Sequence, residues 1–327
     1  MICLGIESTA HTFGIGIVDS KKKVLANVKK TFTTKKGGII PVKAAEHHLK
    51  NFDLILKESL KIAKINLSQI DLISFSIGPG LGHTLRIGAS VARSLSLHLN
   101  KPIIGVNHCI SHLEIGNMLF NVKDPLLLYV SGANTQVISF QEGKYRIFGE
   151  TLDIGAGNFL DCLARELNLG FPGGPKIYEY SLKGKNFIKL PYLVKGMDTG
   201  FGGLLTNLKQ KIKSNKYDIY DICYSVQETI FAMLLEVTER GISHCEKNEL
   251  LLGGGVCCNK RFQEMAKLMC KNRKIRCYIP ENEFLVDNGV MIAWLGIKMY
   301  DKNKKYSLKD TVIKPYERTD EIKVNWK

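Results

Sequence analysis

One arrangement of strands occurs twice in this 327-residue chain, and a repeat of this kind constrains the fold more strongly than any single motif. The first copy has an apolar stretch at Ile2–Ile6, a polar turn at Glu7–Thr12, a second apolar stretch at Phe13–Val18 and a third near Val24. The second copy begins about 125 residues later, and its expected strands and turn are Leu126–Val130, Ser131–Thr135, Gln136–Phe140 and Tyr145–Phe148. The pattern therefore predicts a duplicated α/β structure.

Alternating helices and strands are expected after each copy. After the first copy they are a helix at Ala44–Ala63, a strand at Leu72–Ile77, a helix at Leu85–Leu99, a strand at Ile103–Val106 and a helix that carries His108. After the second copy they are helices at Phe159–Leu167 and Ile222–His244, a strand at Leu250–Leu252, a helix at Asn259–Cys270, a strand at Arg276–Ile279 and a helix at Asn288–Tyr300. We expect two parts, residues 1–123 and 124–327, with the last helix and the tail as candidates to pack back on the first part. The duplication resembles the actin, Hsp70 and sugar-kinase (ASKHA) superfamily, which implies two lobes around a central nucleotide cleft.

Composition narrows the class of protein. The formal net charge is +15, with seven lysines and no acid in residues 21–36 and eight lysines against Asp198 in residues 183–216. Such blocks favour a polyanionic partner, although solvated surface lysines are the alternative reading. No apolar run has the length of a membrane helix, and the N-terminal stretch lacks the basic flank of a signal peptide, so we expect a cytoplasmic protein without a membrane partner. The nine cysteines are scattered without a CxxC pair, which favours reduced thiols and excludes a zinc ribbon.

Two histidines, His108 and His112, are spaced four residues apart in the segment HCISH. On a helix this spacing places both imidazoles on one face, with their Cβ atoms about 6 Å apart, so that both can bind one metal ion. Zinc peptidases with the HExxH pattern have a glutamate after the first histidine, whereas this chain has Cys109 there, so peptide hydrolysis lacks its general base. The same spacing also arises by chance, and structural histidines are the alternative.

A third metal ligand is proposed at Asp287, where we expect a strand to end and a helix to begin. Two imidazoles and a carboxylate suit Fe or Zn with open coordination positions. The alternative role of Asp287 is that of a helix N-cap, for which aspartate is among the best residues. The sequence alone does not bring residue 287 near residue 108.

Glycine-rich loops predict a nucleotide site. Leu251–Asn259 reads as a buried strand, a loop of three glycines and the start of a helix, where backbone can approach a nucleotide closely. The turn of small residues at Ser131–Thr135 can offer N–H groups and hydroxyls to an anion, although an ordinary hairpin is the alternative. Gly170–Pro175 is a rigid turn that opens a helix, either as a stiffener or as a sugar contact.

Several longer stretches together resemble one family. They are GVNHCISHLEIG, YVSGANTQVI, GETLDIGAGNFLDCLARELNL, FPGGPKI, LPYLVKGMD, DICYSVQETIFAMLLEVTERG, LLGGGVCCNKR and VDNGVMIAWLG, and they occur in the order typical of the threonylcarbamoyltransferase family. They resemble its archaeal and eukaryotic branch, the catalytic subunit of the KEOPS complex, over essentially the whole chain.

This resemblance implies a site and partners. It implies one divalent metal ion, Fe²⁺ or Zn²⁺, held by His108, His112, Asp287 and Tyr129. It implies that threonylcarbamoyl-AMP binds at Tyr129, Val130, Ser131, Gly132, Ala133, Asp161, Gly174 and Asn259. It also implies tRNA as the acceptor and three kinds of KEOPS partner: a small atypical kinase or ATPase, a dimerising subunit and a regulatory subunit. The kinase is fused to some relatives, and here we expect it to be a separate chain.

Three positions depart from the family pattern. Ala133 stands where the family has a second glycine, and a methyl group there costs on the order of 1 kcal/mol if the position needs positive φ. Tyr178 stands where the family has an acid, with Glu179 one residue further and turned by about 100° on a helix, so Glu179 is left out of the site. Gly202 replaces a serine, which removes a hydroxyl.

The expected reaction is attack of the N6 amine of the adenosine next to the anticodon, in tRNAs that read codons beginning with A, on the carbonyl of threonylcarbamoyl-AMP, with release of AMP. The sequence offers no convincing general base. Two alternatives remain open: an ATPase or kinase of the same fold, and a weakened tRNA-binding scaffold that recruits the partner kinase.

Overall fold

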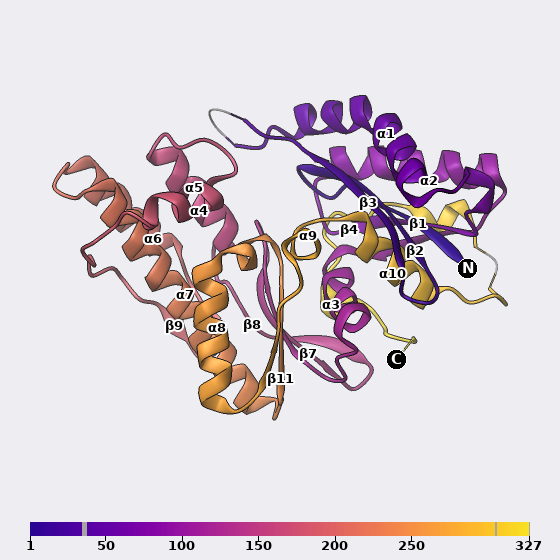
Figure 1. Ribbon diagram of the computed structural model, residues 1–327. Coiled ribbons are helices and arrows are strands. Elements are labelled where there is room, and N and C mark those ends of the chain that lie inside the picture. The colour runs from indigo at the N-terminus through magenta and orange to yellow at the C-terminus, as the bar shows by residue number, and fades with distance from the viewer. Residues whose placement is uncertain (35–37, 305, 327) are drawn as a thin grey trace.

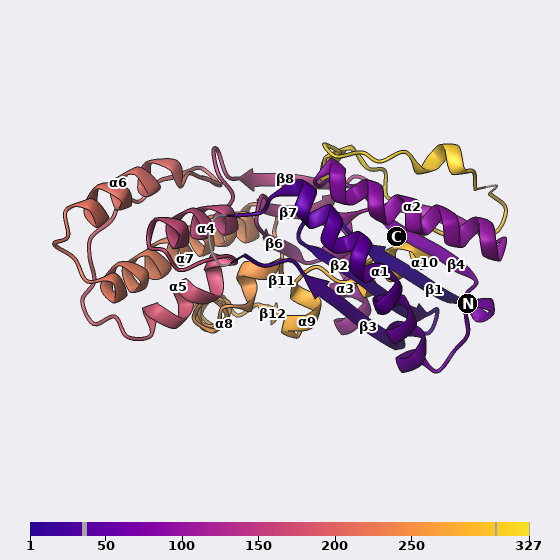
Figure 2. The same ribbon diagram turned by 90° about the horizontal axis from the view of Figure 1, so that it is seen from above.

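The computed structural model describes residues 1–34, 38–304 and 306–326, and it contains two five-stranded sheets covered by helices (Figures 1 and 2). The strand order is β3-β2-β1-β4-β5 in the first sheet and β8-β7-β6-β11-β12 in the second. In each sheet the first three strands are antiparallel neighbours, and the two later strands are added parallel to the first one. The identical topology confirms the predicted duplication. We call the parts built on these sheets the first and second lobes.

The bounds of the elements are as follows. The strands of the first sheet are β1 (Ile2–Glu7), β2 (Thr12–Asp19), β3 (Val24–Thr31), β4 (Leu72–Gly78) and β5 (Ile103–Asn107), and those of the second are β6 (Leu126–Val130), β7 (Thr135–Gln141), β8 (Lys144–Glu150), β11 (Glu249–Gly253) and β12 (Arg276–Tyr278). The helices are α1 (Pro41–Ala63), α2 (Gly82–Leu99), α3 (His108–Phe120), α4 (Ala156–Glu166), α5 (Gly173–Ser181), α6 (Gly202–Lys213), α7 (Ile219–His244), α8 (Lys260–Arg273), α9 (Asn282–Leu285) and α10 (Gly289–Met299). A small hairpin (β9, Val194–Lys195; β10, Asp198–Thr199) and the 3-10 turns η1 (Leu67–Gln69), η2 (Gly255–Cys258), η3 (Leu308–Thr311) and η4 (Thr319–Glu321) complete the fold.

All the strands and helices predicted after each copy are present within a few residues, with one exception. The prediction of a strand immediately before Asp287 is wrong, because residues Asn282–Leu285 form the short helix α9. A four-residue element is too short to show either a helical or a strand period, so the pattern could not distinguish them. Helix α6 and the hairpin β9–β10 were not predicted.

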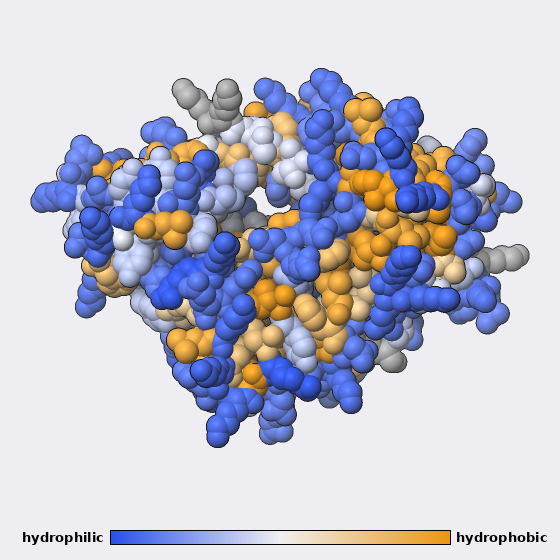
Figure 3. All heavy atoms as spheres, in the orientation of Figure 1, coloured by the Kyte–Doolittle hydropathy of each residue, from blue (hydrophilic) through white to orange (hydrophobic). Residues whose placement is uncertain are grey.

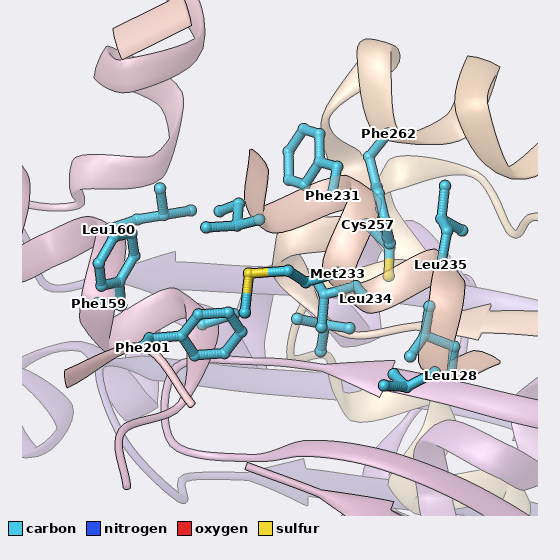
Figure 4. Close-up of a cluster of buried hydrophobic side chains, with 14 of the residues drawn as sticks. Leu128, Phe159, Leu160, Phe201, Phe231, Met233, Leu234, Leu235, Cys257 and Phe262 are labelled. Atoms are coloured by element: carbon cyan, nitrogen blue, oxygen red, sulfur yellow. The ribbon is translucent and has the colours of Figure 1, made fainter. Parts of the chain in front are cut away.

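Helix α7 forms the centre of the second lobe (Figure 4). Its Met233 lies among aromatic rings from neighbouring elements, and the pair Phe159 and Phe201 packs with ring centroids 5.7 Å apart. Phe231 of α7 packs against Phe262 of α8 at 4.7 Å. Each of these side chains is almost completely buried, and each contributes roughly 1.5–3 kcal/mol of burial free energy.

Helix α10 packs with its backbone directly on the first sheet. A Cβ atom added to Gly16 of β2 would lie 2.1 Å from the nitrogen of Val290, and one added to Gly5 of β1 would lie 2.2 Å from the nitrogen of Ala293. From the helix side, a Cβ atom on Gly289 would lie 2.0 Å from the nitrogen of Gly16. No side chain fits at this crossing, so the start of α10 is held at one depth against the sheet.

The C-terminal tail, residues 306–326, crosses from the first lobe to the second. Arg93 of α2 donates to the hydroxyl and the carbonyl oxygen of Thr311 at 2.8 and 2.6 Å. Further along, the amide of Val324 donates to the carbonyl oxygen of Gly143 at 3.1 Å, in the turn between β7 and β8. The tail therefore connects the two lobes in addition to the α9–α10 segment.

All nine cysteines are free thiols. Among the described residues, no helix combines the length and the hydropathy needed to span a bilayer.

We expect Gly289→Ala to lower the free energy of unfolding by about 3 kcal/mol, because its methyl group would overlap backbone atoms that have no room to move. Denaturant unfolding followed by circular dichroism measures this change. Gly203→Ala in α6 is the matched control: nothing lies within 4 Å of its added Cβ atom, so the better helix propensity of alanine should raise stability slightly. Equal effects of the two substitutions would contradict the close packing of α10.

Candidate metal and adenylate site

Helix α3 presents His108 and His112 on one face, as their spacing predicts. The two imidazole rings have centroids 4.9 Å apart, and both side chains are buried. The helix begins at a polar cap, because the side-chain oxygen of Asn107 accepts from the amide of Ile110 at 3.1 Å. Since the cap fixes the first turn, it also fixes the direction in which His108 points.

Asp287 lies beside both histidines. Its Oδ1 atom is 3.4 Å from Nε2 of His108 and 3.4 Å from Nε2 of His112, and one ligand atom from each of the three residues lies within 4.8 Å of the others. The cap of α10 is Asn288, whose side-chain oxygen accepts from the amide of Met291 at 3.0 Å. The alternative role of Asp287 as a helix cap is therefore filled by its neighbour, which leaves its carboxylate directed at the histidines.

Glu7, at the end of β1, is the residue of this site that the sequence did not reveal. Its Oε2 atom is 3.0 Å from Nδ1 of His108, and its Oε1 atom accepts from the amide of Thr9 at 2.7 Å and from the Thr9 hydroxyl. The side chain is fully buried. The only signal in the sequence was an acid directly after an apolar strand, a position that equally suits an exposed turn. A carboxylate on the far nitrogen of a histidine fixes the tautomer and the orientation of the ring.

The charges in the cluster shift the pKa values in opposite directions. Burial alone would lower the pKa of His108, but the carboxylates of Glu7 and Asp287 outweigh it and hold the pKa well above its ordinary value. Burial alone would raise the pKa of Asp287, but its hydrogen bond to His108 and the charge of that imidazole hold it well below its ordinary value. Burial lowers the pKa of His112. A proton on His108 therefore lies between two carboxylates, in the position where a cation would be stable.

Several buried nitrogen and oxygen atoms at this site that could bind a metal ion have no ordinary hydrogen bond. Both ring nitrogens of His112 and the hydroxyl of Tyr129 are buried without a hydrogen bond of ordinary geometry among the described residues. The rings of Tyr129 and His112 have centroids 5.0 Å apart. Burial raises the pKa of Tyr129 well above its ordinary value, and Cys109 and Ser131 lie beside its hydroxyl. Buried polar groups without partners cost free energy, so a ligand that contacts them would be stabilised.

The β6–β7 turn, which contains Ser131, Gly132 and Ala133, is held from two sides. The amide of Gly157 donates to the carbonyl oxygen of Ser131 at 3.1 Å, and the amide of Asn158 donates to that of Gly132 at 2.8 Å, so the first turn of α4 is attached to it. Gly254 of the three-glycine loop approaches the end of β6 with φ of 93°, and a Cβ atom there would lie 2.3 Å from the carbonyl oxygen of Val130. Gly132 and Ala133 remain exposed.

The other residues of the predicted adenylate site form hydrogen bonds within the second lobe. Asp161 of α4 accepts from the amide of Gly173 at 2.7 Å, next to Gly174 at the start of α5, and burial raises its pKa. Asn259 caps α8: its side-chain oxygen accepts from the amides at positions 261 and 262, and its side-chain nitrogen donates to Gln227 at 2.7 Å. Since each side-chain polar atom of Asn259 already has a partner, its contact with an adenylate stays a prediction.

The structure accounts for two of the three departures from the family pattern, those at Ala133 and Gly202, and nothing in it explains Tyr178. Ala133 is not among the residues with positive φ, so its methyl group causes no backbone strain. Glu179 is exposed and pairs with Lys176 at 3.0 Å. A Cβ atom at Gly202 would lie 2.8 Å from a carboxylate oxygen of Asp153, which accepts from the amide of Gly202 at 2.7 Å. The carboxylate of Asp153 thus occupies the space that a side chain at position 202 would need.

Comparison with known proteins gives a family and close relatives. The model of the tRNA N6-adenosine threonylcarbamoyltransferase family matches residues 23–294. The chain is 54% identical over 326 residues to the tRNA N6-adenosine threonylcarbamoyltransferase of Thermococcus kodakarensis, with 100% of both chains covered. It is 52% identical to a probable bifunctional tRNA threonylcarbamoyladenosine biosynthesis protein of Methanocaldococcus jannaschii, and it covers 60% of that longer protein.

Solved structures show the fold. HypF of T. kodakarensis superposes with a TM-score of 0.61 at 14% identity, over 90% of this chain and 47% of that one. Component A of the (R)-2-hydroxyglutaryl-CoA dehydratase of Acidaminococcus fermentans superposes with a TM-score of 0.56 at 13% identity, over 91% and 98%. Together with the two matching sheets, these structures confirm the predicted duplicated ASKHA-type fold.

We expect Glu7→Gln to lower the pKa of His108 in protein treated with a chelator, because the substitution removes a carboxylate that raises it. Since the folded pKa is raised, protonated His108 contributes stability that is fully present below about pH 6.5, the ordinary histidine value, and is lost as pH rises through the folded pKa. NMR titration of the imidazole protons measures the shift. Glu58→Gln on the exposed face of α1 is the control, and an unchanged His108 pKa in Glu7→Gln would contradict this interpretation of the contact.

Proposed function

The chain belongs to the tRNA N6-adenosine threonylcarbamoyltransferase family, and from that premise we propose that it takes the threonylcarbamoyl group from threonylcarbamoyl-AMP to N6 of the adenosine next to the anticodon. The enzyme is a tRNA threonylcarbamoyltransferase. The observation that carries the finer proposal is the cluster of the buried His108 and His112 with the half-buried Asp287. Its His112 has ring nitrogens without a hydrogen bond of ordinary geometry and lies close to Tyr129 at the end of β6. An ATPase or kinase of the same fold has no need of this cluster.

We propose that the cluster holds one divalent ion per subunit, Fe²⁺ or Zn²⁺, through His108, His112, Asp287 and the hydroxyl of Tyr129. Two imidazole nitrogens and a carboxylate oxygen are donors that both ions accept, and the open nitrogens of His112 fit such a role. The charge on His108 fits it as well, because the position between Glu7 and Asp287 already favours a cation. When bound, the ion supplies Lewis acidity to an oxygen of the substrate.

The residues of the second lobe would hold the adenylate. We propose that the exposed turn of Gly132 and Ala133 contacts the phosphate of the adenylate, because short turns of small residues can bind anions through their amides. Asp161, Gly174 and Asn259 complete the predicted contacts with the adenylate, together with Val130 and Ser131. A space-filling view shows an opening between the two lobes, which offers access to a ligand (Figure 3).

The proposed transfer forms one bond and breaks one. The N6 amine of adenosine attacks the carbonyl carbon of the mixed anhydride, the bond from that carbon to the phosphate oxygen breaks, and AMP leaves with the bonding electrons. The amine gives one proton to the phosphate of the departing AMP or to water. An anticodon-loop base is unpaired, so bringing it to the site costs less than extracting a base from a duplex. We assign no general base among the side chains.

Partner proteins are part of this proposal. Relatives described as bifunctional carry a further segment, since this chain covers about 60% of their length. We propose that this enzyme works with the KEOPS subunits, namely a small atypical kinase or ATPase, a dimerising subunit and a regulatory subunit. We further propose that residues 1–123 and 124–327 are the two functional lobes, and that the enzyme acts in the cytoplasm, where its tRNA substrate is found.

We expect His108→Ala to reduce the bound metal from about one ion per chain to near zero and to reduce transfer by about a hundredfold or more, because one ligand and its charge are lost. Metal analysis of the purified protein and mass spectrometry of tRNA incubated with threonylcarbamoyl-AMP measure the two effects. Binding of tRNA should remain. His98→Ala on the exposed face of α2 is the matched control.

The products of the reaction test the alternatives. Release of AMP together with modified tRNA supports the transferase, whereas release of ADP from ATP without modified tRNA would favour a kinase or ATPase of the same fold. Transfer that is absent from the parent protein and from Ala133→Gly, while tRNA still binds, would favour the non-catalytic scaffold.

A further inference from the structure

A basic surface lies at the ends of α5 and α6 and the start of α7; these elements are at the end of the second lobe on the left of Figures 1 and 2. We call it the α6–α7 basic surface. It contains five lysines: Lys183, Lys185, Lys211, Lys213 and Lys216. Four of them are exposed, and Lys211 is half-buried. Three of them contact the start of α7 or the loop before it: Lys183 lies 5.2 Å from the ring centre of Tyr220, Lys211 lies 4.6 Å from that of Tyr217, and the amide of Lys185 donates to Asp221 at 2.7 Å. Lys213 and Lys216 lie at the end of α6 and in the loop that leads to α7.

The described residues provide no ion-pair partner for these five lysines. Among the described residues, no carboxylate lies within 4.0 Å of any of the five, whereas Lys209 of the same helix pairs with Glu166 at 3.1 Å. The two acids at this end, Asp218 and Asp221, accept hydrogen bonds from nearby backbone amides. Asp218 caps α7 by accepting from the amide of Tyr220, and Asp221 accepts from the amides of Lys185 and Asn186. Five lysines thus lie near two carboxylates, Asp218 and Asp221, so the α6–α7 basic surface keeps an excess of positive charge.

Aromatic rings lie among the lysines. Phe187 is 58% exposed and packs edge-on against Tyr224, with ring centroids 6.5 Å apart. Tyr217 is 40% exposed. A phenylalanine ring that keeps most of its surface in water makes little contribution to folding, but it offers a flat face on which an unpaired base can stack.

We propose that the α6–α7 basic surface binds tRNA, with the lysines on backbone phosphates and Phe187 on an unpaired base. The proposal rests on the proposed function, which makes tRNA the substrate. Uncompensated lysines next to an exposed ring suit an RNA strand, since each phosphate accepts a lysine and each unpaired base offers a stacking face. An acidic protein would need the lysines alone and would leave the ring without a role.

The lysines are tested by salt dependence. We expect Lys213→Ala combined with Lys216→Ala to weaken binding of a tRNA transcript roughly tenfold at low salt and to reduce the slope of log affinity against log salt by about one per lysine. Fluorescence anisotropy at several salt concentrations measures both. The matched control is Lys267→Ala combined with Lys271→Ala on the exposed face of α8, which removes the same charge from the same lobe. An effect no larger than that of the control would overturn the proposal.

The ring is tested with two RNAs. We expect Phe187→Ala to weaken binding of tRNA about fivefold or more and to leave binding of a fully paired RNA duplex unchanged, because a duplex has no free base to stack. Equal loss for both RNAs, or no loss for tRNA, would remove Phe187 from the proposal. Melting temperature and metal content, measured for every variant, separate these effects from misfolding.

Both binding tests are independent of turnover. If the parent protein binds tRNA with a steep salt dependence but modifies none, the proposed function is wrong, while the proposed tRNA-binding surface still stands. A Lys213→Ala and Lys216→Ala protein that binds tRNA like its parent, while the parent modifies tRNA, would sink the surface alone.

Discussion

The backbone contact between α10 and the first sheet is the constraint on which the candidate site depends. Gly5, Gly16 and Gly289 allow the helix to lie against β1 and β2 with no side chain between them. Asp287 is two residues before this contact, so its position is set by backbone packing. The histidines come from α3, a segment almost 180 residues earlier in the chain. Because close-packed backbone has no room to shift, the start of α10 is fixed on the sheet. The distances of 3.4 Å from Oδ1 of Asp287 to Nε2 of both histidines therefore follow from the fold.

Electrostatics then decides what this geometry can hold. Three groups that can be charged lie in contact: the buried Glu7 and His108 and the half-buried Asp287, and two of them are acids. Burying them without compensation would be costly, and the raised pKa of His108 shows how a proton lessens the cost in the free protein. A divalent ion would supply more positive charge at the same place and would also bind one of the open nitrogens of His112. A cation bound here would therefore stabilise the site itself.

Much of this could be predicted from the sequence, and the failures have physical causes. The duplication was visible because each strand alternates or runs apolar between polar turns, and the histidine pair was visible because helical spacing is local. Glu7 was missed because, in a sequence, a buried acid after a strand cannot be distinguished from an exposed one. The helix α9 was mistaken for a strand because four residues carry no period. The proximity of Asp287 depends on glycines at positions 5 and 16, whose role appears only when the helix they contact is known.

The C-terminal tail shows that the position of α3 is itself held from outside the sheet. The side-chain nitrogen of Asn107 donates to Glu317 at 3.1 Å, while its oxygen caps the helix that begins with His108. At the middle of the helix, Trp326 donates to Glu114 at 2.9 Å. A helix held at its start and at its middle cannot slide along its axis or rotate about it without breaking one of these part-buried hydrogen bonds. The tail therefore helps to position α3, and with it the two histidines, through contacts that lie outside the cluster.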